Sequence, residues 1–236
     1  MKTQKLLEAR NVEVRYRGES GFALRDISFV LGEGEKAALV GANGAGKSTM
    51  LLALAGVLPY TGTIDYLNYT GINNAGSDYG EKRPGLVMQN PDDQLFMPTV
   101  AEDLAFGPRN FKTPEDEIAA RTEKTLAALG IARLRDRLTS RLSGGEKRLA
   151  ALAGILMMES PLLLLDEPSS FLDPRSRRRL LDLLRARSEA MLVATHDLDL
   201  ARSLCDRVIL LGGGTILADG GVRLLDDGVL LDAGAL

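Results

Sequence analysis

One eight-residue stretch constrains the fold more than any other: residues 41–48 read Gly-Ala-Asn-Gly-Ala-Gly-Lys-Ser. The stretch follows an apolar run at 36–40 and opens a helical pattern at 47–55. The pattern G-x-x-x-x-G-K-[ST] between a strand and a helix is typical of a phosphate-binding loop, because glycines let successive backbone N–H groups turn around an anion. We therefore expect Lys47 to reach the β- and γ-phosphates of a nucleotide and the Ser48 hydroxyl to bind Mg²⁺. The alternative, a glycine-rich turn without function, would not need this strand–loop–helix context.

Composition narrows the class of protein. The chain has 236 residues, 45% of them hydrophobic and 26% charged, which is typical of a soluble globular domain that can carry an inserted subdomain. A net charge of −3 lacks the basic character of a dedicated nucleic-acid binder. One cysteine, Cys205, and one histidine, His196, argue against a disulfide framework and against a zinc site of His and Cys alone.

No segment predicts a membrane span or a leader. The longest apolar run, 149–158, is short of the about 20 residues that a bilayer needs. The N-terminal residues have no apolar signal segment. We therefore expect an intracellular protein that associates with a membrane only through a partner.

Short apolar runs alternate with helical stretches, which indicates an α/β fold. Strands are expected at 12–16, 36–40, 85–89, 162–165 and 190–195, a terminal hairpin at 208–217, and a polar loop or weak hairpin at 68–80. Thr99 with Glu102, and Ser143 with Glu146, have the form of capping boxes that begin helices. Because 90–158 lacks clear strands, we interpret it as a helical insert.

Asp166 and Glu167 directly follow the four leucines at 162–165. A buried strand in an α/β sheet delivers its next residues to the edge where ligands bind, so Asp166 is expected in the Mg²⁺ shell. Glu167, one residue further, can act as general base toward water. Alone, two solvated acids at the end of a strand would be an equally good interpretation, but the phosphate-binding loop favours the catalytic one.

Leu142-Ser143-Gly144-Gly145-Glu146 resembles the signature motif of ATP-binding-cassette (ABC) ATPases, L-S-G-G-Q, with Glu146 in the last place. The resemblance implies that this helix start closes on the γ-phosphate held by a second subunit. Locally, an ordinary capping box before a core helix explains the same residues, and one helix start can do both.

Further positions resemble the family's motifs in the same order. Gln89 resembles the glutamine that contacts Mg²⁺ and water and links to the membrane partner, and His196 resembles the histidine that senses the γ-phosphate. Residues 169–173 resemble the D-loop, with Phe171 where a small residue is usual. Tyr16 resembles the aromatic that stacks on adenine, with a routine strand tyrosine as the alternative. The nucleotide contacts implied are Tyr16, Gly41, Asn43, Gly44, Ala45, Gly46, Lys47, Ser48, Thr49, Ser143, Gly144, Gly145 and Asp173.

The resemblance implies one ABC ATPase domain over 1–236. Its phosphate-loop α/β core would comprise 1–88 and 159–236, including an N-terminal antiparallel β subdomain, and the inserted α-helical subdomain would comprise 89–158. The implied activity is hydrolysis of ATP with Mg²⁺. The implied catalytic residues are Lys47, Gln89, Glu167 and His196, and the implied Mg²⁺ ligands are Ser48, Gln89 and Asp166.

The stretch 89–108 resembles the ATPase subunits of energy-coupling-factor importers, especially the cobalt/nickel type. This implies a second ABC ATPase subunit, identical or related, and a membrane-embedded component that docks near 89–106. It also implies a peripheral location on the cytoplasmic face of the membrane and no nucleic-acid partner. From the residues alone, Leu95, Phe96, Met97 and Phe106 form a plausible apolar docking groove. The alternative is a loop that packs on its own helical insert.

Three rival functions remain. A chromosome-maintenance ATPase needs a long coiled coil between Lys47 and Asp166, and no sustained heptads occur there. A soluble ABC protein of translation usually carries two cassettes. The ATPase of another ABC transporter class is distinguished by the stretch 90–106. The solute, whether cobalt, nickel or a vitamin, stays open because the ATPase does not touch it.

Overall fold

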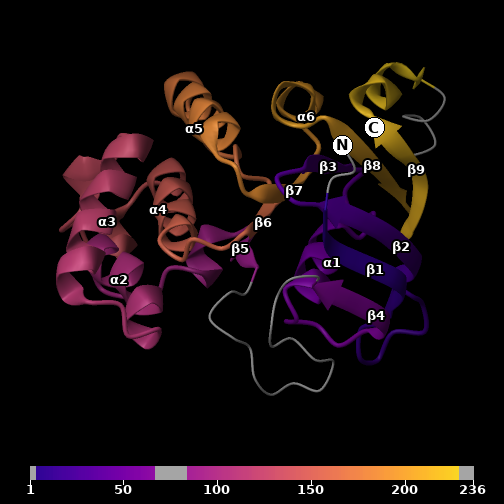
Figure 1. The fold of residues 1–236 in the computed structure, drawn as a ribbon, viewed down its shortest axis with the longest axis horizontal. Coiled ribbons are helices and arrows are strands. Elements are labelled where there is room, and N and C mark those ends of the chain that lie inside the picture. Colours follow the sequence, from indigo (N-terminus) through magenta and orange to yellow (C-terminus); the bar gives the residue numbers. More distant parts are fainter. Residues whose placement is uncertain (1–3, 67–83, 229–236) are drawn as a thin grey trace. The chain divides into compact units, whose positions relative to one another are not determined.

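The computed structural model describes residues 4–66 and 84–228 (Figure 1). The expected loop or hairpin at 68–80 lies outside these residues. The chain divides into two compact units, which are described separately. Unit 1 comprises Met1–Leu86, Pro161–Asp166 and Ser188–Leu236, and unit 2 comprises Val87–Ser160 and Glu167–Arg187.

Unit 1 contains a three-stranded antiparallel sheet with the order β2-β1-β4. Its strands are β1 (Lys5–Val14), β2 (Leu24–Gly32) and β4 (Thr61–Tyr66). The expectation that the first strand continues through Tyr16 was wrong: the strand ends two residues earlier. The chain turns there, since the N–H of Glu19 donates to the carbonyl of Tyr16 at 3.1 Å and Gly18 has a φ of 90°.

The second sheet has six strands in the order β5-β6-β7-β3-β8-β9. They are β5 (Gly85–Val87), β6 (Leu162–Asp166), β7 (Ala190–Thr195), β3 (Lys36–Val40), β8 (Arg207–Gly212) and β9 (Thr215–Gly221). Strands β6, β7, β3 and β8 run parallel, and β8 and β9 form the expected antiparallel hairpin. The mixed α/β fold with an antiparallel subdomain is thus confirmed.

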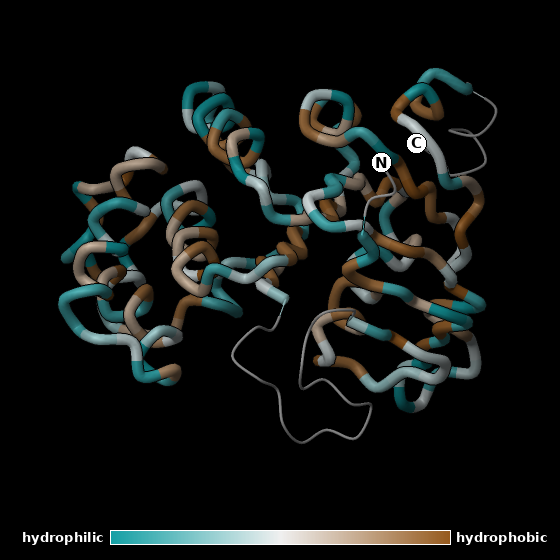
Figure 2. Tube along the Cα trace, in the orientation of Figure 1, coloured by the Kyte–Doolittle hydropathy of each residue, from teal (hydrophilic) through white to brown (hydrophobic). Residues whose placement is uncertain are grey.

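The parallel strands are buried on both faces, as continuous apolar runs require. On one face of the sheet, alternate residues such as Leu39, Leu164 and Leu192 belong to a single hydrophobic core. The same core contains apolar residues of α1 (Lys47–Leu54) and of the antiparallel sheet. The opposite face receives α6 (Leu198–Leu204), which contacts β3 and β7. Figure 2 shows the hydrophobic stretches along these strands.

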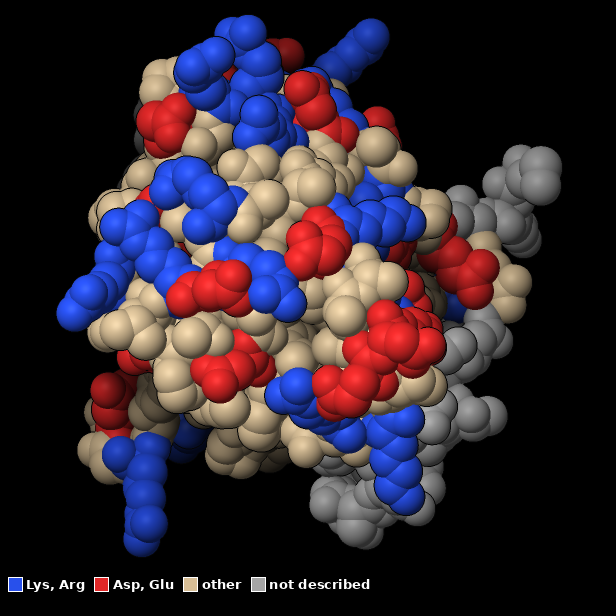
Figure 3. Space-filling view, turned by 90° about the vertical axis from the view of Figure 1, so that its left-hand side faces the viewer, with Lys and Arg blue, Asp and Glu red and all other residues tan. Residues whose placement is uncertain are grey.

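Unit 2 is mostly helical. Its elements are η1 (Pro91–Asp93), α2 (Val100–Asn110), α3 (Glu115–Leu129), η2 (Ala132–Leu134), η3 (Thr139–Arg141), α4 (Gly144–Leu156) and α5 (Pro174–Ala186). Both expected capping boxes form, at the starts of α2 and α4. Helices α2, α3 and α4 pack on one another, and α5 packs on α3. Charges of both signs cover the outer face of this unit (Figure 3).

Unit 2 extends two residues beyond each end of the expected insert 89–158, and it also includes a later segment. Residues Glu167–Arg187 group with unit 2, because α5 packs on α3. The interpretation as one domain over 1–236 stays a prediction. Among the described residues, no helix combines the length and the apolarity that crossing a membrane requires.

Candidate functional site

Residues 41–46 form the loop that joins β3 to α1, and Lys47 and Ser48 begin the helix, as the sequence predicts. Two of its glycines have no room for a side chain. A Cβ on Gly41 would lie 2.3 Å from the carbonyl oxygen of Leu211, and Gly46, with a φ of 103°, would place one 2.7 Å from Leu24 Cδ2. The tight turn of the loop therefore depends on glycine at these positions.

The start of α1 has no side-chain cap and no acidic residue in its first turn. Its backbone N–H groups and the positive end of its dipole can therefore bind an anion. Lys47 is buried, and its ammonium donates to the carbonyls of Gly41 at 2.6 Å and Ala42 at 2.9 Å. The loop thus gathers a cation and bare N–H groups, which is the chemistry that nucleotide phosphates require.

Tyr16 lies beside this loop. Its hydroxyl hydrogen-bonds with Oγ1 of Thr49 at 2.9 Å, in the first turn of α1. The side chain is 38% exposed, which leaves part of the ring surface accessible. The structure therefore brings Tyr16 to the start of the helix that follows the phosphate-binding loop.

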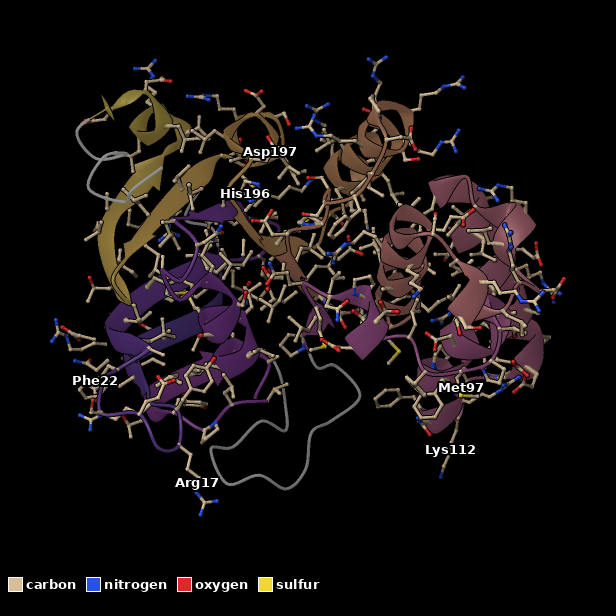
Figure 4. All side chains as sticks on the ribbon, turned by 180° about the vertical axis from the view of Figure 1, so that it is seen from behind. Arg17, Phe22, Met97, Lys112, His196 and Asp197 are labelled. Atoms are coloured by element: carbon tan, nitrogen blue, oxygen red, sulfur yellow. The ribbon has the colours of Figure 1, made fainter. Side chains whose placement is uncertain are left out.

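The carboxyl ends of three adjacent parallel strands meet at one edge of the six-stranded sheet. β3 leads into the loop, β6 ends in the buried Asp166, and β7 ends at Thr195, directly before His196. Register pairs Val40 with Thr195 and Asp166 with Ala194. Figure 4 labels His196 and Asp197 at the turn from β7 to α6. Ligands of α/β sheets bind at such an edge.

Glu167 is buried and has a left-handed backbone, with a φ of 48°. Its carbonyl accepts a hydrogen bond from the N–H of Ser170 at 3.1 Å. A left-handed conformation costs a non-glycine residue roughly 1–2 kcal/mol. Such strain is often found where a side chain must be aimed at a functional site.

The start of α4 is capped by its own side chains. Ser143 Oγ accepts from the N–H of Glu146, and Glu146 Oε2 accepts from the N–H of Ser143 at 3.0 Å. Arg133 donates to the other oxygen of Glu146 at 2.7 Å. The hydrogen bond from the Ser143 backbone, followed by those from Arg133 and the Ser143 hydroxyl, holds the pKa of Glu146 below its usual range.

A cavity of about 520 Å³ lies beside the start of α4, within unit 2. Its lining includes Ser143, Gly144, Gly145, Phe171 and Asp173, so the structure brings the signature residues and the D-loop together. A Cβ on Gly145 would lie 2.8 Å from the carbonyl oxygen of Phe171. Phe171 itself is 75% exposed.

Asp173, at the same cavity, is engaged as the N-cap of α5. Its carboxylate accepts from the backbone N–H groups of Arg175 and Ser176 and from the Ser176 hydroxyl at 2.6 Å. These bonds, led by that from the Ser176 hydroxyl, lower the pKa of Asp173. A nucleotide contact by Asp173 stays a prediction.

Gln89 follows β5 in unit 2 and its side chain is exposed. Its carbonyl accepts a hydrogen bond from Arg148, on α4. The sequence motifs did not indicate Arg148 as a residue of the site. The signal available was an arginine directly before the apolar run at 149–158.

The described residues contain no cluster of three His, Cys, Asp or Glu that could hold a metal by itself. Mg²⁺ normally uses one or two protein oxygens together with substrate phosphates and water, so a hydroxyl and one carboxylate suffice. Ser48, in the first turn of α1, and Asp166, at the end of β6, provide that donor set in unit 1. These residues fit a Mg²⁺ ion bound together with a nucleotide.

A glycine-rich loop with a lysine, between a parallel strand and a helix, defines a phosphate-loop nucleotide-binding protein. A family model described as "ABC transporter" matches residues 24–170, and the chain belongs to this family. ATP hydrolysis is the function of the family, so the chain is an ATPase and the ATP-binding subunit of a transporter.

Named relatives support the narrower resemblance. The cobalt import ATP-binding protein CbiO of Rhodobacter capsulatus is 46% identical over 221 residues, which cover 91% of this chain and 79% of the relative. The energy-coupling factor transporter ATP-binding protein EcfA of Carboxydothermus hydrogenoformans is 41% identical over 219 residues, covering 91% and 80%. The structure of cbiO1 from Clostridium perfringens, part of the ABC transporter complex cbiONQ, has a TM-score of 0.77 at 33% identity, covering 97% and 93%.

Proposed function

We propose that this chain is the ATP-hydrolysing subunit of an energy-coupling-factor type importer for cobalt, nickel or a vitamin. Its similarity to CbiO and EcfA supports the importer type. The second candidate is the ATPase of another ABC transporter class, which has the same nucleotide chemistry and differs in how it engages the membrane. The surface that engages the membrane partner therefore decides between them.

The observation that carries this proposal is an exposed aromatic pair. The rings of Phe96 and Phe106 meet edge to face, with centroids 4.7 Å apart, and their side chains are 62% and 42% exposed. Apolar surface costs roughly 25 cal/mol per Å² to leave in water. An exposed aromatic pair is therefore suited to dock an apolar segment of a partner.

The segment before α2 is fixed rather than loose. The backbone N–H groups of Phe96 and Met97 both donate to Oδ1 of Asp103, at 3.0 and 2.9 Å. Figure 4 shows Met97 and Lys112 at the same end of unit 2. Leu95 and Met97 are half-buried, whereas Phe96 packs on Phe106 of α2 and both rings keep an exposed surface.

In the proposed reaction, water attacks the γ-phosphate of ATP. The loop Gly41–Ser48 and its lysine hold the phosphates, and adenine stacks on Tyr16. Glu167 accepts the proton of the attacking water, Gln89 positions that water, and His196 contacts the γ-phosphate. Ser48, Asp166 and Gln89 would hold Mg²⁺, which supplies charge neutralisation on the phosphates.

We propose that the active form is a dimer with a copy of this chain or a close relative. The partner's Ser143, Gly144 and Gly145 would face the γ-phosphate, and Asp173 would lie at the same junction. The dimer would sit peripherally on the cytoplasmic face of the membrane, attached through segment 89–106. The exposed Phe171 supports an interface next to the signature residues.

The test is a double variant, Phe96→Asp with Phe106→Asp, expressed together with the membrane subunits of the transporter. We expect a folded chain that binds ATP, fails to co-purify with the membrane subunits and no longer supports uptake of radiolabelled cobalt, nickel or vitamin. The control is Val57→Asp, an apolar residue of unit 1 that is as exposed as Phe96, at 61%. Continued assembly and uptake by the double variant would exclude this segment as the docking surface.

A further inference from the structure

Arg148 is 1% exposed and is among the largest fully buried side chains of the described residues. Burying a guanidinium is costly unless its donors find partners. Its Nη1 donates to the carbonyl oxygen of Met88 at 2.6 Å, and its Nη2 donates to that of Gln89. The guanidinium therefore holds the two peptide groups that flank the Cα of Gln89.

Neighbouring contacts attach the same segment to α4. Lys147 forms an ion pair with Asp92 in η1. The side chain of Gln94 links the segment to the helix. Its Nε2 donates to the carbonyl of Ala151 on α4 at 3.1 Å, and its Oε1 accepts from the N–H of Met88 at 3.1 Å. Segment 88–94 is thus fixed to one side of α4 over more than one helical turn.

Arg148 lies five residues after Ser143, the N-cap of α4. An α-helix rises 1.5 Å per residue, so Arg148 lies about 8 Å along the helix axis from Ser143. Because the helix is stiff over this distance, a displacement of its first turn also displaces Arg148. The backbone of Gln89 is held by that helix while its side chain is exposed. The position of Gln89 therefore depends on the position of α4.

We propose that Arg148 is a positioning residue that ties Gln89 to the signature helix, so that Gln89 takes its working position only when the start of α4 is engaged. This inference rests on the proposed function, in which Gln89 positions the attacking water. The competing explanation is that Arg148 only fills the core of unit 2. A core-filling residue would affect turnover independently of the Gln89 side chain.

The experiment is a double-mutant cycle on ATP turnover with Arg148→Lys, Gln89→Ala and the combined variant. Lysine keeps the charge but lacks the planar fork that reaches two carbonyls at once. Arg148→Lys should lower kcat about tenfold with the KM for ATP within about twofold, because unit 1 holds the nucleotide. In the Gln89→Ala background the same change should alter kcat less than about twofold.

The control is Arg121→Lys, since Arg121 donates to the carbonyl of Met157 at 3.4 Å, beyond the far end of α4. It should leave kcat within about twofold of wild type. Equal losses from Arg148→Lys with and without the Gln89 side chain would overturn the proposal, as would an unchanged kcat. If thermal melting shows that Arg148→Lys does not fold, Lys147→Met replaces it, with a smaller loss that should also vanish in the Gln89→Ala background.

A second readout separates this inference from the proposed function. Amide hydrogen exchange of segment 88–94 should be faster in Arg148→Lys than in wild type and unchanged in Arg121→Lys. Unchanged exchange in Arg148→Lys would reject the positioning role even if the wild-type chain hydrolyses no ATP. Absence of wild-type hydrolysis would reject the proposed function instead.

Discussion

The hydroxyl of Tyr16 lies 2.9 Å from Oγ1 of Thr49, which joins the turn after β1 to the first turn of α1. The bond orients the phenol next to the phosphate-binding loop before any nucleotide arrives. Orientation in advance reduces the entropy lost when a ligand is bound. The pair therefore offers a way to separate ring stacking from hydroxyl orientation.

Tyr16→Ala should weaken ATP binding by about 1–2 kcal/mol, the range of a lost aromatic stack. Tyr16→Phe keeps the ring and should lose much less. Isothermal titration of the isolated chain with ATP measures both, with Tyr60→Ala as a control tyrosine of unit 1. Equal losses in the two Tyr16 variants would assign the effect to the hydroxyl bond and not to stacking.

Glu167→Gln should bind ATP normally but hydrolyse it at least about a hundredfold more slowly, because the amide keeps the shape and cannot accept a proton. We also expect an ATP-bound dimer to accumulate, visible by size-exclusion chromatography with ATP. A steady-state phosphate-release assay measures the rate. Turnover near the wild-type value would remove Glu167 from the role of general base.

Ser143→Arg should leave ATP binding to the isolated chain intact and abolish turnover that depends on dimerisation. The bulky cation would obstruct the start of α4, where the partner's γ-phosphate is proposed to lie. Thr99→Arg is the matched control, since Thr99 caps α2 with the same capping-box geometry. If Ser143→Arg reduces binding and turnover together, the arrangement across two subunits is not supported.

Glu146 should make folding stability depend on pH. Its pKa is lower in the folded chain than in the unfolded one, so its ionised form stabilises the fold above the unfolded pKa, and this contribution is lost as pH falls through the folded pKa. Thermal melts of wild type and Glu146→Gln should therefore differ at neutral pH and converge in acid. A constant difference down to about pH 2 would contradict the ionic role of this carboxylate.

The local features of the fold could be predicted because they depend on neighbouring residues. The phosphate-binding loop after β3 and the capping boxes of Thr99 and Ser143 form as the sequence indicates. Each capping box rests on side chains that act within three residues of their own position. The roles proposed for the site residues stay predictions.

Relationships between distant residues could not be predicted. The burial of Arg148 depends on two carbonyls about 60 positions earlier in the chain. The pairing of Phe96 with Phe106 depends on where α2 begins and on the carboxylate of Asp103. No periodicity in the sequence reports such contacts, because they arise only when separate segments pack together.

The phosphate-binding loop follows β3, and both strands that pair with β3 come from the last fifth of the chain. β3 pairs with β7 on one side and β8 on the other. During synthesis, Lys36–Val40 must therefore wait without a hydrogen-bonded neighbour until Ala190–Thr195 and Arg207–Gly212 have left the ribosome. Such long-range pairing slows folding and leaves an apolar edge open to aggregation, so chaperones that hold nascent chains should matter more for this protein than for one built from local hairpins.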